Sequence, residues 1–270
     1  MIEALHQHCN ELFVQHNYQE LLQAIVCGRP LRSQFLKEPL IYAGVIHLFV
    51  VSGGHLVFLT DWLDRLSKLL NWPLPKLAVF LILAFYGAVA GFEPPVLRAL
   101  FLFAVTHLSK EFHLNWPEIL QQLLSGGLAL LFINDQWELL SLLMSWQASV
   151  TLLLFFESKE IVKATGVYLS MLPIISLFHV PSPVTILFNI ALVPLFALFL
   201  LPLSIVSIFI PWLQTTLLSY VFDLLFFVLR QFEFILTPLA SGGINVSILA
   251  LFFFLLFLHA MLNPKKRERL

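Results

Sequence analysis

The feature that most constrains this chain is a succession of apolar stretches running from about Leu77 to Leu262, with few charged residues between them. Each stretch is about 15 to 25 residues long, and the longer ones match a hydrocarbon layer about 30 Å thick. Only 11% of the residues are charged and 59% are hydrophobic, whereas a soluble domain carries about 25% charged residues. We therefore expect an all-α, polytopic membrane helix bundle.

The apolar stretches predict about eight membrane helices, with boundaries good to several residues. They lie at about 77 to 91, 95 to 109, 119 to 133, 137 to 156, 165 to 179, 184 to 210, 216 to 236 and 246 to 262. The first three are near 15 residues long, below the usual 17 to 25, so tilted, broken or re-entrant segments are expected among them. The chain divides into an N-terminal amphipathic helical segment at 1–39, a membrane domain at 40–262 and a basic tail at 263–270.

The N-terminal segment places apolar residues near helical spacing among His, Gln, Asn and Glu, so it should lie on the membrane or pack against the bundle. Gly28 and Pro30 break this helix. The following run, Leu40 to Leu59, could span once and leave the N-terminus outside, or enter and turn at Gly53-Gly54 and leave it inside. The N-terminus lacks a cationic region followed by an apolar run, so no cleavable signal peptide is predicted.

Basic residues indicate the orientation of the bundle. They cluster in alternate connections and at the C-terminus: Arg65, Lys68, Lys76, Lys110, Lys159, Lys163, Lys265, Lys266, Arg267 and Arg269. The intervening turns at 92–94, 134–136, 180–183 and 237–245 contain no Lys or Arg. The positive-inside rule makes these turns extracytoplasmic and the C-terminal tail cytoplasmic.

Four short motifs follow one another along the chain. They read GVIHLFVVSGGHL, FYGAVAGFEPPVLRAL, NDQWELLSLLMSWQAS and PSPVTILFNIALVP. Their candidate functional residues are Gly44, His47, Ser52, Gly53, His55, Tyr86, Gly91, Arg98, Gln147, Asn189 and Pro194. In this order the motifs resemble the membrane-embedded competence domain of the ComEC-type DNA-uptake proteins of bacteria, over about residues 20 to 210.

The resemblance implies a membrane channel component that imports single-stranded DNA during natural competence, as a multi-pass protein of the bacterial cytoplasmic (inner) membrane. The larger relatives add an oligonucleotide-binding-like domain and a metallo-β-lactamase-like domain. This sequence contains neither, and no His-x-His-x-Asp-His cluster, so nuclease activity, a metal ion and a cofactor are not expected. With a net charge of -1, the DNA partner rests on the resemblance and not on charge.

Charged residues inside apolar runs are candidates for a polar cavity, because they cost several kcal/mol unless paired or hydrated. Arg98 follows Pro94-Pro95 at the mouth of a helix, where it could meet a passing phosphate or snorkel to the interface. Asp223, Arg230 and Glu233 share one predicted helix, in which Arg230 and Glu233 are spaced to pair or could line a conduit.

The histidines and cysteines do not form a recognisable catalytic or metal-binding pattern. His47 and His55 lie close to one helical face but two turns apart, so a shared metal ion is not expected. The Ser52 sequence context does not match a Ser/His hydrolase, and we expect no enzyme activity; the small residues Ser52 and Gly53 fit a turn or a close helix approach better. Cys9 and Cys27 are interpreted as two ordinary apolar thiols.

Import of DNA against an inside-negative potential would cost about 2.3 kcal/mol per phosphate per 100 mV. The sequence has no G-x-x-x-x-G-K-[ST] loop, so we expect a separate ATPase motor or single-strand-binding protein as partner. Membrane lipid is the other partner, and a homo-oligomer is left open. The alternative function is a noncatalytic or degenerate membrane scaffold of the same fold that does not conduct DNA.

Overall fold

The computed structural model describes residues 2–72, 74–175 and 181–232, and every regular element in these ranges is a helix. The helices are α1 Ile2–Glu11, α2 Gln19–Cys27, α3 Gln34–Tyr42, α4 Ile46–Phe49, α5 Gly53–Leu69, α6 Lys76–Val89, α7 Pro94–Glu111, α8 Glu118–Leu130, α9 Gln136–Leu154, α10 Glu160–Ile175, α11 Thr185–Leu195, α12 Leu201–Val206 and α13 Ser219–Gln231. Two wider π-helical segments, η1 Phe196–Leu200 and η2 Leu213–Leu218, continue α11 and precede α13. The all-helical fold is therefore confirmed for the described ranges.

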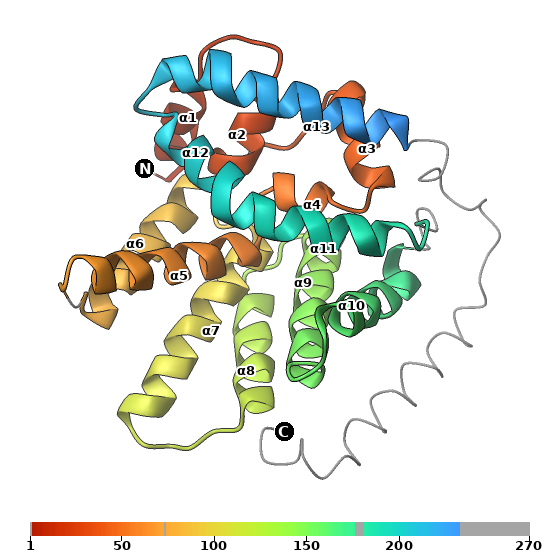
Figure 1. Cartoon of the computed structure of the whole chain (residues 1–270). Helices are drawn as coiled ribbons and strands as arrows, with labels where there is room; N and C mark the ends of the chain where they lie inside the picture. The colour runs from red at the N-terminus through yellow and green to blue at the C-terminus, as the bar shows by residue number, and fades with distance from the viewer. Residues whose placement is uncertain (1, 73, 176–180, 233–270) are drawn as a thin grey trace.

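The helices form two regions, which Figure 1 shows one above the other. The first, which we call the capping layer, consists of α1–α4 together with α11–α13 and the two π-helical segments. The second, the hairpin bundle, consists of α6–α10, in which α7, α8, α9 and α10 each pack against the next. Helix α5 packs against α6 and α7 at the side of the bundle.

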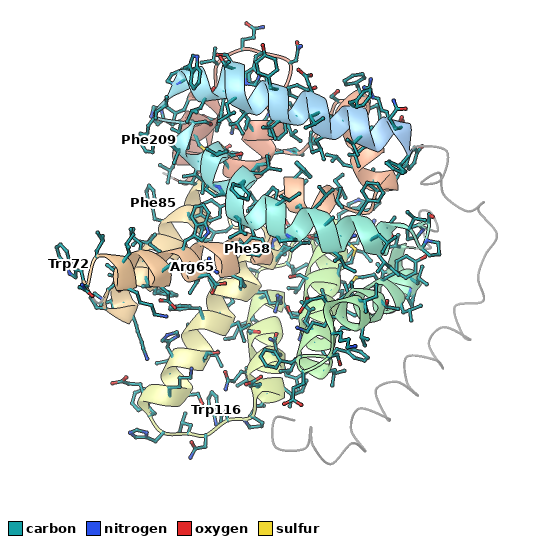
Figure 2. The ribbon with its side chains drawn as sticks, viewed as in Figure 1. Phe58, Arg65, Trp72, Phe85, Trp116 and Phe209 are labelled. Atoms are coloured by element: carbon teal, nitrogen blue, oxygen red, sulfur yellow. A yellow bond between two sulfur atoms is a disulfide. The ribbon has the colours of Figure 1, made fainter. Side chains whose placement is uncertain are left out.

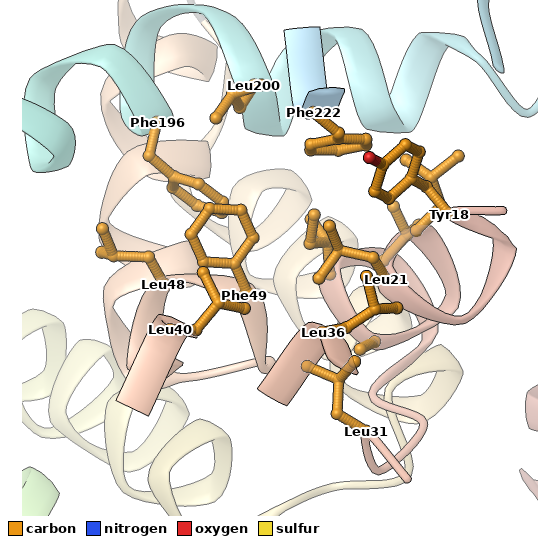
Figure 3. Packing of buried hydrophobic residues seen from close by; sticks show 14 of the residues in the cluster. Tyr18, Leu21, Leu31, Leu36, Leu40, Leu48, Phe49, Phe196, Leu200 and Phe222 are labelled. Atoms are coloured by element: carbon orange, nitrogen blue, oxygen red, sulfur yellow. The ribbon is translucent and has the colours of Figure 1, made fainter. Parts of the chain in front are cut away.

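The capping layer has a continuous apolar core (Figure 3). Phe196 of η1 meets the ring of Phe49 edge to face, with 5.5 Å between the ring centroids. Tyr18 packs against Phe222 and Phe226 of α13. Helices from the two ends of the described chain thus share one core, because neither set alone can bury its apolar face.

The hairpin bundle buries polar residues beside an apolar cluster in α6 and α7. Its buried positions include Arg98 and several small or polar side chains: Ser109, Gln121, Ser125, Thr151 and Ser170. Its outer positions include large apolar side chains such as Leu131 and Phe85, and Figure 2 shows Phe85 pointing away from the helices. Small and polar residues between helices with apolar residues outside are typical of helices packed in lipid.

Local sequence explains several helix ends. The Asp135 carboxylate caps α9 by accepting hydrogen bonds from the backbone of Trp137 and Glu138, at 2.8 and 2.9 Å. Pro94 begins α7, where the missing N–H has no partner to lose. Gly28 ends α2 with a φ of 76°, so the predicted break at this glycine is present. A second break, between α1 and α2, was not predicted.

The predicted number of membrane spans is not confirmed. Seven of the eight predicted segments coincide with helices, and the eighth, 246–262, lies outside the described residues. Among the residues that the structure describes, three helices are long and apolar enough to cross a membrane: Gln136–Leu154, Thr185–Val206 and Leu213–Gln231. The remaining helices are shorter or carry more charge. The apolar stretches therefore predicted the positions of these helices but not the number of membrane spans.

The run Leu40 to Leu59 does not form one helix. It is divided among the end of α3, the four-residue α4 and the start of α5, with extended backbone at Val50 and Ser52. The turn therefore lies just before the Gly53-Gly54 pair, which forms the first turn of α5. A single helix spanning from Leu40 to Leu59 is not present.

Candidate functional site

Arg98 lies at the centre of the hairpin bundle and is only 4% exposed. Its Nε donates to Ser145 Oγ at 3.1 Å and its Nη2 to Ser149 Oγ at 2.6 Å, both on α9. Its Nη1 donates to Gln122 Oε1 of α8 at 3.1 Å. We call these four residues the Arg98 cluster; it connects α7, α8 and α9 through one side chain.

All three acceptors in the Arg98 cluster are neutral. In the described part of the chain, no carboxylate lies within ion-pair distance of the guanidinium. A hydrogen bond from a charged donor contributes about 1.5 to 3 kcal/mol, so three of them offset much of the cost of burying the charge. The sequence left open whether Arg98 meets a phosphate or snorkels to the interface; in this structure its side chain is buried and held by three neutral partners, and two of its five N–H donors have no partner among the described residues.

Gly53 brings the first motif against the second. A Cβ atom at Gly53 would lie 2.9 Å from the carbonyl oxygen of Pro95 and 3.6 Å from Nη2 of Arg98. A side chain here would therefore separate the first turn of α5 from the first turn of α7. The close helix approach that the small residues predicted is present at Gly53.

Ser52 and His55 form a local cap at the start of α5. The backbone N–H of Ser52 donates to His55 Nδ1 at 3.1 Å, and Ser52 Oγ also lies 3.1 Å from this nitrogen. The His55 ring stands edge to face with Phe196, 5.3 Å between centroids, and His55 Nε2 has no partner among the described residues. His47 belongs to a different helix, α4, so the two histidines do not share one helical face.

Asn189 connects the fourth motif to the first. Its Nδ2 donates to the carbonyl oxygen of Gly44 at 3.3 Å and to that of Thr185 at 2.9 Å. Gly44 has a φ of 68° and lies against Thr185. Pro194 has no N–H to donate, and the wide turns of η1 begin two residues later and direct Phe196 into the core of the capping layer.

The remaining motif residues make contacts between neighbouring helices. The Tyr86 hydroxyl donates to the carbonyl oxygen of Ile25 at 3.4 Å. Gln147 donates from Nε2 to the carbonyl oxygen of Ser170 at 2.5 Å, which connects α9 to α10. Gly91 has a φ of 78° in the connection between α6 and α7, a conformation that favours glycine.

The charged residues of α13 meet the N-terminal segment. Asp223 accepts a hydrogen bond from the Tyr18 hydroxyl at 2.5 Å, and Arg230 lies over the ring of Phe35, 4.0 Å from its centroid. Burial, and then the Asp223 carboxylate, raise the pKa of Tyr18 to about 12. Glu233, the predicted partner of Arg230, lies outside the described residues.

Two features escaped sequence reasoning. Cys9 and Cys27 are joined in a disulfide, so their interpretation as free thiols was wrong. The partners of Arg98 were also missed, although Ser145 and Ser149 are four residues apart and therefore share a helical face. The described residues contain no group of three or more His, Cys, Asp or Glu side chains that could hold a metal ion.

The arrangement defines a helical protein with membrane-capable helices, in which three distant motifs meet at a buried arginine and the fourth contacts the first at Gly44. The Competence protein family matches residues 33–266, and the chain belongs to this family. This match confirms the resemblance expressed by the four motifs. No curated protein and no solved structure matches the chain.

Proposed function

We propose that the protein is a membrane channel component that imports single-stranded DNA during natural transformation, in the bacterial inner membrane. The observation that carries the proposal is the family match over residues 33–266, which covers all four motifs. The structure adds a physical reason for the motifs to occur together: residues of the first three connect α5, α7 and α9, and Asn189 of the fourth joins α11 to Gly44 of the first.

The proposed role of Arg98 is to hold the bundle in its working arrangement. Its guanidinium makes polar contacts that join three helices, and the charge has no carboxylate partner in the described ranges. Opening a path through the bundle would require these bonds to be exchanged, and a DNA phosphate is an acceptor that could replace a serine hydroxyl. Arg98 therefore belongs to the conducting region in this proposal, as a positioning residue in the closed arrangement.

The protein is proposed to act with separate soluble partners. A passive conduit cannot accumulate DNA against about 2.3 kcal/mol per phosphate per 100 mV, so an ATPase motor or a single-strand-binding protein supplies the direction. In this proposal the chain binds DNA and lipid but performs no covalent chemistry.

The test is uptake of labelled DNA into the cytoplasm of cells in which the gene is deleted and then restored. Wild type is expected to restore uptake, and Arg98→Ala is expected to abolish most of it at equal membrane abundance. Arg65→Ala is the matched control, because Arg65 lies exposed on α5. Unchanged uptake after deletion, in a strain with no second copy of the gene, would refute the proposal.

A scaffold that does not conduct DNA is the second candidate. The observation that favours it is that the Arg98 guanidinium donates hydrogen bonds to three protein acceptors, which suits a fixed structural role. The two functions differ in a liposome experiment with the full chain: only a conduit increases the passage of single-stranded DNA when a single-strand-binding protein is trapped inside. A scaffold instead restores uptake in cells only while another membrane protein conducts the DNA.

A further inference from the structure

The polar interior of the hairpin bundle contains hydrogen-bond donors that the described residues do not use. The Arg98 guanidinium has five N–H groups, and three of them donate within the Arg98 cluster. One N–H on Nη1 and one on Nη2 have no partner in the described ranges. The two serine hydroxyls of the cluster and the amide nitrogen of Gln122 also donate to no described atom. The cluster therefore has an excess of donors.

A further unpaired donor lies in the neighbouring contact between α8 and α9. Trp146 Nε1 is buried and has no hydrogen-bond partner among the residues that the structure describes. An indole N–H can donate but cannot accept. The Trp146 ring lies against Gly126, which follows Gln122 of the Arg98 cluster by about one helical turn. The excess of donors therefore continues along the same pair of helices.

The first turn of α5 adds positive character beside Arg98. A Cβ atom at Gly53 would lie 3.6 Å from Arg98 Nη2, so the start of the helix adjoins the guanidinium. The backbone N–H groups of Gly53 and Gly54 have no partner in the described part of the chain, and the first turn contains no acidic residue. Helix N-termini attract anions. A Cβ atom at Gly54 would have no neighbour closer than 3.4 Å, so the backbone there is open to a ligand.

The positive charge lies at the middle of a membrane-capable helix. Ser145, which accepts from Arg98 Nε, is the tenth of the nineteen residues of α9, about 14 Å along the helix from Gln136. A cation at this depth is costly unless an anion or water accompanies it. In the described ranges no carboxylate pairs with Arg98. A bound anion would therefore compensate a charge that the described protein groups leave unpaired.

We propose that the Arg98 cluster and the first turn of α5 form a binding site for one phosphodiester group of a single-stranded nucleic acid. A phosphodiester carries one negative charge and two non-bridging oxygens, which accept from the unpaired N–H groups of the guanidinium. The phosphates of lipids lie at the membrane surface and not at the middle of a membrane-capable helix. The proposal rests on the proposed function and adds the place at which the protein holds the strand.

The first test measures whether the site recognises charge. Labelled thymidine dinucleotide, which contains one phosphodiester, is dialysed to equilibrium against the full chain in detergent micelles. The methyl phosphotriester of the same dinucleotide keeps both bases but has no charge. We expect the triester to bind at least about tenfold more weakly than the diester. Equal binding of the two probes would overturn the proposal.

The second test places the recognition at Arg98. Gln122→Glu keeps the side-chain length and the acceptor for Nη1 but adds a carboxylate that neutralises the guanidinium. We expect the diester to bind at least about tenfold more weakly to this variant. Gln136→Glu is the matched control, because Gln136 is exposed at the start of α9, and its binding should equal that of wild type. Unchanged binding by Gln122→Glu would overturn the site. If Gln122→Glu does not accumulate, Ser149→Asp makes the same test from α9.

Competition identifies the source of the phosphodiester. Oligothymidylate is expected to displace the dinucleotide, and displacement by phosphatidylglycerol instead would overturn a nucleic acid as the ligand. Uptake of DNA in cells is scored separately. Normal uptake by Gln122→Glu, together with lost dinucleotide binding, would overturn the part of this site in import and leave the proposed function standing. Unchanged uptake after deletion of the gene would refute the proposed function whatever the binding result.

Discussion

The capping layer and the hairpin bundle differ in the residues that they bury. The capping layer encloses an apolar core around Phe196, Phe49 and Phe222, and meets α13 charges with N-terminal side chains. The hairpin bundle encloses Arg98 and presents residues such as Phe85 and Leu131 outward. Both regions therefore present large apolar side chains outward, and the bundle buries polar groups beside its own apolar cluster.

The difference lies in the contacts between helices and not in the surroundings, because two of the three membrane-capable helices, Thr185–Val206 and Leu213–Gln231, belong to the capping layer and the third to the bundle. Between lipid-facing helices the stabilising contacts are close packing and hydrogen bonds. The capping layer depends on the packing of its large side chains. The bundle depends on a few polar contacts and on small residues at helix contacts. Substitutions in the two regions should accordingly fail for different reasons.

The largest expected effect is the loss of a large side chain from the capping layer. Phe196→Ala removes a fully buried ring that contacts the rings of Phe49 and His55. We expect the free energy of unfolding to fall by about 3 to 5 kcal/mol, from lost transfer energy and the cavity left behind. Equilibrium unfolding of the full chain in detergent micelles measures it.

Phe199→Ala is the matched control, because Phe199 lies in the same π-helical segment and is 58% exposed. Its free energy of unfolding should change by less than about 0.5 kcal/mol. Equal losses for the two variants would mean that the core of the capping layer is no better packed than its outer surface, and the comparison would break.

The next effect tests the polar interior of the bundle. Arg98→Met fills a similar volume but removes all three hydrogen bonds and leaves the partly buried Ser145, Ser149 and Gln122 acceptors without this donor. We expect a loss of about 3 kcal/mol in the same unfolding measurement. Arg98→Lys should recover only part of it, since an ammonium group cannot span three partners in the fixed planar geometry of a guanidinium.

Arg65→Met serves as the control for charge, because Arg65 is exposed on α5. A neutral or stabilising Arg98→Met would contradict the assignment of the bundle as a region held by polar contacts. Such a result is known for buried ionic groups replaced by well-packed apolar ones, so the measurement has two distinct outcomes.

The sequence predicted those features that depend on the residues of a single helix. The helices from α6 to α13 follow from the apolar stretches, and the break at Gly28 from the freedom of glycine at positive φ. The number of spans did not follow, because several bundle helices are shorter or more charged than a single span requires. Their place in the molecule depends on neighbours that periodicity does not reveal.

The candidate site was predicted as residues but not as contacts. Arg98 was singled out, yet its burial depends on α9 presenting Ser145 and Ser149 from another hairpin. The disulfide was missed for the same reason: the spacing of Cys9 and Cys27 carries no information until α1 and α2 fold back on each other. What sequence could not supply was in each case a tertiary contact.

A smaller effect tests close packing inside the bundle. A Cβ atom at Gly126 of α8 would lie 2.5 Å from the Trp146 ring of α9. Gly126→Ala should therefore force the two helices apart and lower the free energy of unfolding by about 1 to 3 kcal/mol.

Gly127 provides the matched control, because a Cβ atom at this position would have nothing within 4 Å. Gly127→Ala should instead stabilise α8 by about 0.5 to 1 kcal/mol. Two changes of the same sign would show that α8 and α9 are not in close contact.

The smallest expected effect tests how the capping layer holds the charge on α13. Tyr18→Phe removes the hydroxyl that donates to Asp223, at a cost of about 1 kcal/mol. Because the pKa of Tyr18 is raised to about 12 in the folded protein, against 10.0 ordinarily, the folded state holds this proton more tightly than the unfolded state. The stabilisation is complete below pH 10 and is lost as the pH rises through 12.

The free energy of unfolding, measured between pH 10 and pH 12, should decline less steeply for Tyr18→Phe than for wild type. Tyr220→Phe, which removes an exposed hydroxyl from the same helix, should keep the wild-type decline. Identical pH profiles for wild type and Tyr18→Phe would show that the Tyr18–Asp223 contact does not hold the N-terminal segment on α13.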